Sequence, residues 1–122
     1  VEYLAVAYSD EGVELRKTGI TLPIMVMNPE VMNFEMMIKN RLEPEIYNFR
    51  QLNQLAEVLK KHHGEPFKIH LKLDTGMHRL GFEEREINEL VVRFNRYSVI
   101  WQVVMKRNTM DSQNYKLIVL KR

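Results

Sequence analysis

The stretch 69–82 carries the side chains with the clearest capacity for chemistry. It reads I-H-L-K-L-D-T-G-M-H-R-L-G-F, so an apolar run containing Lys72 ends at Asp74, turns at Gly76 and leads to Arg79. In β/α barrels, polar residues at the carboxyl ends of the strands build the active site. A lysine that points into a barrel costs free energy unless it is paired or modified, because a desolvated ammonium loses its hydration. The charge pattern alone also allows a surface ion pair between Lys72 and Asp74, with Arg79 in solvent.

Short apolar segments that alternate with amphipathic segments must position these residues. The apolar segments begin near residues 3, 22, 42 and 67, a spacing typical of β/α units. The amphipathic segments predict helices from Ser9 to about Gly19, from Asn28 onward, from Phe49 to His62 and from Glu83 to about Phe94. This alternation predicts parallel strands joined by right-handed crossovers.

The expected fold class is therefore α/β, as a partial TIM (β/α) barrel of about four β/α units with parallel strands. A complete barrel of this type takes ~250 residues, whereas the chain has 122. A small open α/β domain would fit the same pattern. In both cases, open edges of parallel strands would favour self-association.

The composition excludes several classes of protein. A net charge of +2, with the charged residues interleaved, does not indicate a nucleic-acid partner. No apolar run is long enough to span a membrane, and no charged start followed by an apolar stretch marks a signal peptide. The chain has no cysteine, which fits a reducing compartment. We therefore expect a cytoplasmic protein without a nucleic-acid or membrane partner.

Residues 70–82, H-L-K-L-D-T-G-M-H-R-L-G-F, resemble the signature of the alanine racemases. The resemblance continues upstream in residues 3–20, in L-P-I-M-V-M-N-P-E at 22–30 and in L-E-P-E-I-Y-N-F-R at 42–50. These segments look like successive barrel units of that family, particularly of the form fused to a muropeptide ligase. The resemblance covers residues 1–91.

The resemblance implies a pyridoxal phosphate enzyme that interconverts L- and D-alanine for peptidoglycan synthesis and works as a homodimer. Lys72 and Arg79 match the family's cofactor-side residues, and they are the cofactor-binding residues that we predict. The family lysine is often carbamylated, and its carbamate holds the arginine against the ring oxygen of the cofactor. A carbamate replaces a buried cation by an anion, so its interaction with Arg79 becomes attractive.

The same resemblance implies that the catalytic groups are not in this chain. The family lysine that forms the Schiff base belongs to a segment before Val1, and the catalytic tyrosine and the phosphate-binding residues come later than this chain reaches. Racemisation needs two groups on opposite faces of the substrate α-carbon. We therefore name no catalytic residue and expect an inactive fragment whose own binding of pyridoxal phosphate is weak or absent.

Residues 92–122 depart from the family pattern. Residues 97–105 and 115–120 could be two strands of a divergent C-terminal hairpin. We prefer the hypothesis of an out-of-frame translation, because permitted codons for residues 98–105, shifted by one base, give the family-like peptide F-S-H-L-A-G-S-D. A tail of that origin is expected to pack loosely, since selection has not shaped its contacts.

Two other functions fit parts of the sequence. The D-T-G at 74–76 is the motif of aspartic proteases, in which paired carboxylates share a proton, but the β/α rhythm does not suit an all-β protease. A non-catalytic small α/β domain is the second alternative. His62 and His63 have no carboxylate or cysteine at ligand spacing, so no metal site is expected.

Overall fold

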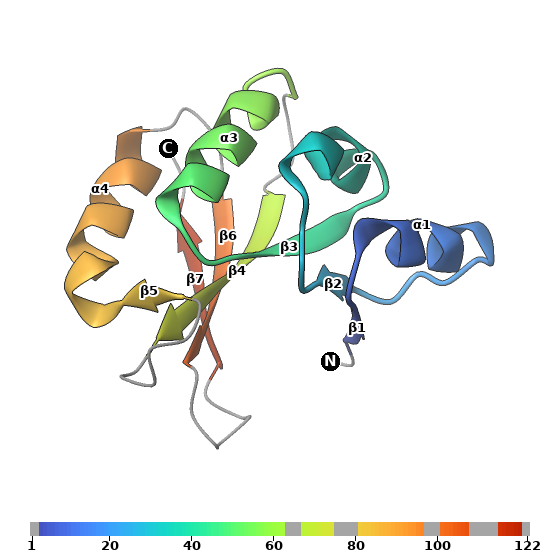
Figure 1. Ribbon diagram of the computed structural model, residues 1–122, viewed down its shortest axis with the longest axis horizontal. Coiled ribbons are helices and arrows are strands. Elements are labelled where there is room, and N and C mark those ends of the chain that lie inside the picture. Colours follow the sequence, from blue (N-terminus) through green and yellow to red (C-terminus); the bar gives the residue numbers. More distant parts are fainter. Residues whose placement is uncertain (1–2, 63–66, 75–80, 97–100, 108–114, 121–122) are drawn as a thin grey trace. The chain divides into compact units, whose positions relative to one another are not determined.

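The computed structural model describes residues 3–62, 67–74, 81–96, 101–107 and 115–120. These residues belong to two compact units, Val1–Glu45 and Ile46–Arg122. Figure 1 labels the helices and strands of both units in chain order.

The first unit is a parallel sheet whose strands are linked by helices. Its elements are β1 (Leu4–Val6), α1 (Ser9–Lys17), β2 (Ile24–Val26), the short helix η1 (Val31–Asn33), α2 (Phe34–Lys39) and β3 (Leu42–Ile46), which reaches the unit boundary. Leu4 pairs with Ile24, and Ile24 pairs with Leu42, both in parallel register. The predicted parallel β/α order is therefore present.

Local signals in the sequence account for both ends of α1. The backbone N–H of Tyr8 donates to Glu11 Oε1 at 3.0 Å, and acidic residues occupy the first turn, where the helix dipole favours them. The last turn carries Arg16 and Lys17, which suit the opposite end of the dipole. Gly19 follows with a φ of 92°, a left-handed conformation that glycine adopts at helix ends without strain.

The core of the first unit lies between its strands and helices. Every residue of β2 is buried, as expected for a strand that is covered on both faces. Gly12 places α1 close to this core, because a Cβ at Gly12 would lie 3.0 Å from both methyl carbons of Leu42. The side chains of the unit with no exposed surface are Ile24, Val26, Phe34, Met37 and Leu42.

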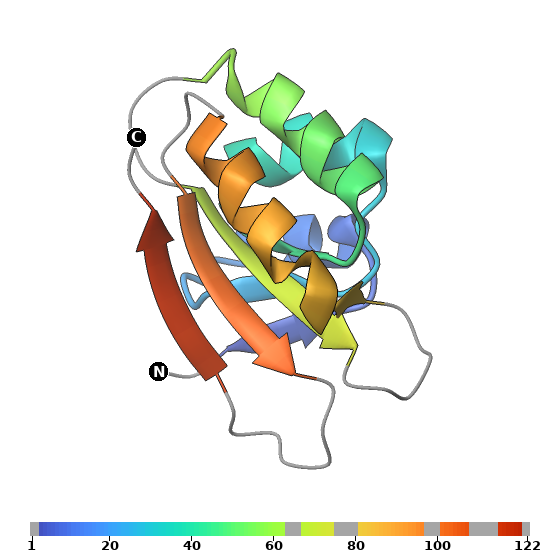
Figure 2. The ribbon, with the colours of Figure 1, turned by 90° about the vertical axis from the view of Figure 1, so that its left-hand side faces the viewer.

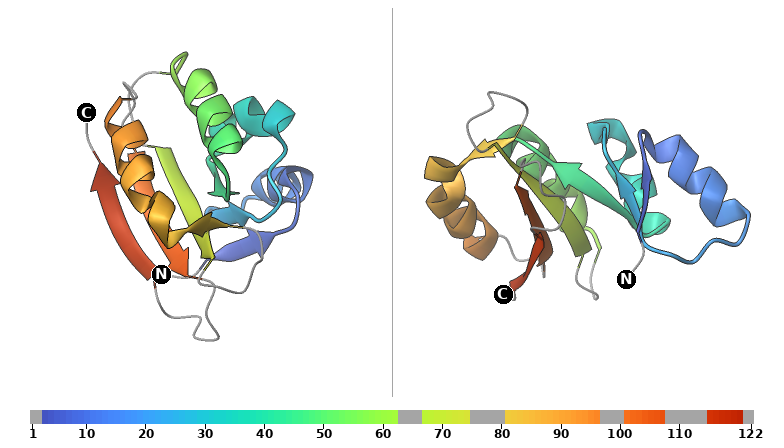
Figure 3. Two further views of the ribbon diagram at one scale, coloured as in Figure 1. Left: turned by 60° about the vertical axis from the view of Figure 1, so that its left-hand side comes forward. Right: turned by 90° about the horizontal axis from the view of Figure 1, so that it is seen from below.

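The second unit places two helices on one face of a sheet. Its elements are α3 (Phe49–Leu59), β4 (Phe67–Asp74), β5 (Phe82–Glu83), the short helix η2 (Glu84–Glu86), α4 (Ile87–Arg96), β6 (Trp101–Arg107) and β7 (Tyr115–Leu120). β4 pairs in parallel with β6 from Phe67↔Trp101 to Leu73↔Arg107, and the end of β4 pairs in parallel with β5. β7 pairs with β6 in antiparallel fashion. Figures 2 and 3 show α3 and α4 over the same face of these strands.

Contacts between aromatic rings hold the helices on the sheet. Phe94 of α4 and Trp101 of β6 are buried, with their ring centroids 5.3 Å apart in an edge-to-face arrangement. Phe49 of α3 and Phe82 of β5 form a second such pair at 5.0 Å. The apolar side chains that share this core include Leu52, Leu55, Ala56, Leu59, Ile69, Leu71, Leu73, Leu90 and Val103.

The predicted fold class, a partial β/α barrel with parallel strands, is confirmed, and the sheet is not closed. The parallel strands around the D-T-G motif do not fit the all-β protease alternative. Among the described residues, no helix is long and apolar enough to cross a membrane. The predicted helix after Asn28 begins later than expected, as η1 and then α2.

Candidate cofactor site at the end of β4

Lys72 lies near the carboxyl end of β4, on the face of the sheet away from the helices. The helix-covered face is identified by Phe67 and Leu73, because their register partners Trp101 and Phe82 pack against α4 and α3. Alternate residues of a strand point to opposite faces. Lys72 is therefore on the other face, which lies inside when a barrel closes.

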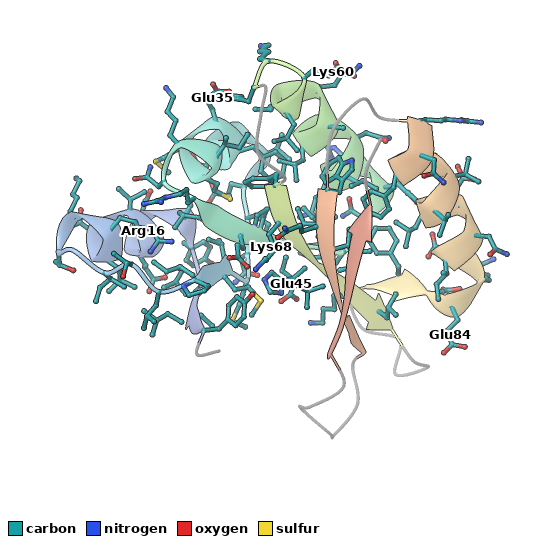
Figure 4. The ribbon with its side chains drawn as sticks, turned by 180° about the vertical axis from the view of Figure 1, so that it is seen from behind. Arg16, Glu35, Glu45, Lys60, Lys68 and Glu84 are labelled. Atoms are coloured by element: carbon teal, nitrogen blue, oxygen red, sulfur yellow. The ribbon has the colours of Figure 1, made fainter. Side chains whose placement is uncertain are left out.

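Two further residues share this inner face with Lys72. Lys68 and His70 precede it at intervals of two residues, and His70 is only 2% exposed, whereas both lysines are half-buried. Each of the three side chains has an interaction partner. Figure 4 labels Lys68 on β4. Lys68 and His70 were not predicted from the sequence as site residues, although the K-H-K alternation within an apolar run is a signal that points to them.

The chain returns to the end of β4 shortly after the predicted site. Phe82 is the register partner of Leu73 and Glu83 that of Asp74. Phe82 is 1% exposed and packs against Phe49, so this return point is fixed by the core. The described residues on both sides of the segment that contains Arg79 therefore lie at the same strand end.

Arg79 lies outside the described residues, as do Gly76 and the side chain of Asp74. The backbone of Asp74 is described, and Asp74 is the last residue of β4. The structure thus locates one of the two predicted cofactor-binding residues, Lys72, and the meeting of Lys72 with Arg79 stays a prediction.

The donor set on the inner face fits an anionic, phosphate-bearing cofactor of the kind that the resemblance implies. Lys68 and Lys72 lie on either side of the buried His70 along the strand. An ammonium at Lys68 attracts phosphate and phenolate oxygens, and a lysine such as Lys72 can also be carbamylated and then hold a guanidinium. Within the part of the chain that the structure describes, no group of three or more His, Asp or Glu side chains could hold a metal ion. Pyridoxal phosphate chemistry needs no such group.

The segment after residue 91 is ordered around the core rather than loosely attached to it, as far as it is described. Phe94, Trp101 and Val103 are buried, and β6 extends the parallel pairing of β4 along its whole length. The two strands of the hairpin interpretation are present as β6 and β7. These described residues are closely packed, and the anomalous, out-of-frame character of residues 92–122 stays a hypothesis.

Comparison with known proteins identifies what the chain resembles. Residues 1–107 match the family model described as alanine racemase, N-terminal domain, so the match extends past residue 91 to the end of β6. The alanine racemase of Sorangium cellulosum is 38% identical over 98 residues, which cover 77% of this chain and 26% of that protein. That of Clostridium perfringens strain SM101 is 42% identical over 84 residues, covering 68% of this chain and 22% of the relative. The chain spans about a quarter of the length of these curated relatives.

Solved structures show the same similarity. The alanine racemase of Clostridium difficile 630 superposes with a TM-score of 0.75 and 35% identity, over 88% of this chain and 28% of that one. The alanine racemase from E. faecalis gives a TM-score of 0.68 and 28% identity, over 83% of this chain and 28% of the other.

Proposed function

The chain belongs to the alanine racemase family, and from this membership we propose that it is part of the pyridoxal-phosphate-binding barrel of an enzyme that interconverts L- and D-alanine. The observation that carries the proposal is the position of Lys72, half-buried on the inner face near the carboxyl end of parallel β4. In β/α barrels this end of the strands is where ligands bind.

Lys72 and Arg79 are the proposed cofactor-side pair. They are seven positions apart in the sequence, and Arg79 is three positions before Phe82, which pairs with the neighbour of Lys72. A residue spans at most ~3.6 Å of chain, so this short connection favours a meeting of the two side chains at the end of β4. Two cations there would repel each other unless one of them changes its charge.

Carbamylation of Lys72 would remove this repulsion. The neutral amine of Lys72 adds to carbon dioxide, a new N–C bond forms, and one proton is released to solvent. The product is an anion that accepts charge-assisted hydrogen bonds from a guanidinium. In this form Lys72 would orient Arg79 toward the ring of the cofactor.

Bound pyridoxal phosphate supplies an electron sink that makes the α-proton of an amino acid easier to remove. The residues of this chain would hold and orient the cofactor, whereas removal and return of the proton need two groups on opposite faces of the α-carbon. The family resemblance assigns neither role to a residue of this sequence. We therefore propose that the chain alone does not racemise alanine, and that a homodimeric, cytoplasmic enzyme serving peptidoglycan synthesis is the setting in which its residues act.

Carbamate formation gives a test that does not depend on activity. The protein is equilibrated with ¹³C-bicarbonate, and carbamates are detected by carbon NMR in the wild type, Lys72→Arg and Lys60→Arg. Lys60 is a matched control because its ammonium pairs with Glu57 at 2.9 Å on an exposed helix end. We expect a carbamate signal that persists in Lys60→Arg and is lost in Lys72→Arg. A wild type without a signal at Lys72 would reject the carbamate.

The lack of turnover is tested separately. The purified chain is incubated with L-alanine and pyridoxal phosphate, and D-alanine is measured with D-amino-acid oxidase. We expect no more product than cofactor alone releases. Turnover that requires the protein would show that other groups of the chain supply the two proton-transfer roles.

A further inference from the structure

We propose that β7 caps the open edge of the sheet in the second unit. It occupies the edge of β6 that the next strand of a β/α barrel would use, and it thereby prevents a separate barrel segment or a second copy of the chain from pairing there. The occupant of this edge is thus a segment of the chain itself.

The pairing of β6 leaves little of either edge open. On one side β6 pairs with β4 in parallel from Trp101 to Arg107, and on the other it pairs with β7 from Trp101↔Leu120 to Lys106↔Tyr115. β7 therefore covers six of the seven residues of the strand. In the described part of the chain, only Arg107 of β6 has no partner in β7.

The direction of β7 distinguishes it from a barrel strand. All strands of a β/α barrel are parallel, and they reach one another through helical crossovers. Figure 2 shows β7 running opposite to β4 and β6. The family match ends at residue 107, the last residue of β6, so β7 lies beyond the part that the family model describes. β7 uses the place of the next strand but cannot continue the barrel.

Physical chemistry explains why an added strand would settle on this edge. An unpaired edge of a parallel sheet presents a row of N–H and C=O groups that template pairing with other chains. Antiparallel pairing is slightly more stable per residue than parallel pairing and can be reached through a short connection. Because β7 is tethered to β6 by residues 108–114, its local concentration exceeds that of any free partner at ordinary protein concentrations.

The consequence is an edge that is closed until β7 leaves it. A complementing barrel fragment would have to displace the paired strand before it could extend the sheet from β6. The cap would exist even if the chain bound no cofactor, so its tests are independent of those for Lys72.

Two adjacent proline substitutions provide the test. Leu117 and Ile118 are register partners of Val104 and Val103, and the amides of adjacent strand residues point to opposite edges. One of Leu117→Pro and Ile118→Pro therefore removes a donor to β6, while the other removes an amide that faces away, a position where proline is tolerated on an edge strand. Each variant serves as the control for the other.

Amide hydrogen exchange is measured for residues 101–107. In the wild type, we expect protection of all the amides of β6 that lie between paired strands, including those that face β7. In the donor-removing variant, the amides of β6 that face β7, which are every second amide of the strand, should exchange at least about tenfold faster. The amides of β6 that face β4 should keep their protection. The same variant should self-associate with rising concentration in sedimentation velocity, and the other variant should behave as the wild type does.

The proposal has two ways to fail. If the wild-type amides of β6 that face β7 exchange as fast as those of an unstructured peptide, the cap does not exist in solution. If both variants keep full protection and remain unassociated, the pairing of β7 does not close the edge. Emission from Trp101, which is fully buried beside Phe94, reports whether each variant keeps its core. If both variants unfold, the wild-type exchange pattern still decides whether β7 pairs with β6 in solution.

Discussion

Arg93 Nη1 donates a hydrogen bond to Asn53 Oδ1 at 2.9 Å and so joins α4 to α3 across the helical layer of the second unit. The same guanidinium donates through Nε to Glu89 Oε1 at 3.0 Å and lies 4.5 Å from the ring centroid of Phe49. Phe49 in turn packs against Phe82, which pairs with the end of β4. Arg93 therefore stabilises the packing under the candidate cofactor site.

Replacing Arg93 should destabilise the protein through this contact network. Arg93→Ala removes a charge-assisted hydrogen bond, a half-exposed ion pair and a cation–π contact, and we expect a loss of about 1–2 kcal/mol in the free energy of unfolding. Urea unfolding followed by circular dichroism measures the change. Arg93→Lys should recover part of the ion pair but not the second hydrogen bond, because lysine lacks the planar fork.

Arg96→Ala is the matched control, since Arg96 is an exposed arginine on the same helix. Its effect should stay within about 0.5 kcal/mol. Combining Arg93→Ala with Asn53→Ala should cost less than the sum of the single changes, because both remove the same hydrogen bond. Additive effects would mean that the two side chains do not interact in solution.

Trp101 is the chain's single tryptophan, and it has 0% exposure in the core of the second unit. Trp101→Ala should cost about 3–5 kcal/mol, because it deletes a large buried side chain that packs against Phe94. In the wild type, the emission of Trp101 should be blue-shifted and should move to longer wavelength on unfolding. A solvent-exposed emission maximum under native conditions would contradict its burial and would indicate that the segment after residue 91 is loosely packed.

The sequence predicted the elements of the fold well where local signals were strong. The apolar runs near residues 3, 22, 42 and 67 became strands in parallel register, and the amphipathic segment from Phe49 became the longest helix of the described chain. Their bounds were predicted less well. The run at 3–8 yielded a strand of only three residues, because strand length depends on the neighbour with which it pairs.

Contacts between distant residues could not be predicted in the same way. The burial of Trp101 depends on its register with Phe67 and on the approach of Phe94, and no local pattern contains either. The direction of β7 has the same origin, since an apolar run does not say which strand it will join. For the candidate site, Lys72 could be identified from its residue type and its spacing to Arg79. The face of the sheet on which Lys72 lies could be assigned only from the pairing of β4 with β6.

Gly12 and Gly19 should respond differently to alanine. At Gly12 a Cβ would lie 3.0 Å from Leu42 Cδ1 and 3.0 Å from Leu42 Cδ2, and Leu42 is fully buried. Gly12→Ala should therefore lower the free energy of unfolding by about 1–3 kcal/mol through overpacking, which the higher helix propensity of alanine partly offsets. At Gly19 nothing lies within 4 Å, and only the φ of 92° opposes a side chain. Gly19→Ala should therefore cost about 1 kcal/mol through backbone strain.

Two further variants separate these causes by thermal or urea unfolding. Gly12→Val should be worse than Gly12→Ala, because a branched side chain adds to the overlap with Leu42. Gly19→Asn should be better tolerated than Gly19→Ala, since asparagine adopts left-handed conformations more readily. Equal losses for Gly12→Ala and Gly12→Val would show that Leu42 moves aside.

Arg16 of α1, labelled in Figure 4, binds four backbone carbonyls in two other segments of the first unit, residues 20–22 and 40–41. Nε donates to Asn40 O at 2.9 Å, Nη1 to Ile20 O at 3.0 Å and to Leu22 O at 2.7 Å, and Nη2 to Arg41 O at 3.1 Å. Desolvation and the charge of Arg41 lower the pKa of Arg16, while Glu43 raises it. The side chain is therefore held in place at some electrostatic cost.

Arg16→Lys should destabilise the protein by about 1–2 kcal/mol in the free energy of unfolding, because an ammonium cannot reproduce the fork that reaches all four oxygens. Arg41→Gly should instead raise the free energy of unfolding. Arg41 has a φ of 54° and its positive charge repels that of Arg16, so glycine relieves both the backbone strain and the repulsion.

The lowered pKa of Arg16 also predicts how stability depends on pH. A lowered pKa of a cation means that its charged form opposes folding, so the free energy of unfolding should rise only where the pH passes the pKa of Arg16, far into the alkaline range. The difference in the free energy of unfolding between the wild type and Arg16→Lys should therefore stay constant from about pH 5 to 9. A difference that varies across this range would mean that another titrating group causes the effect.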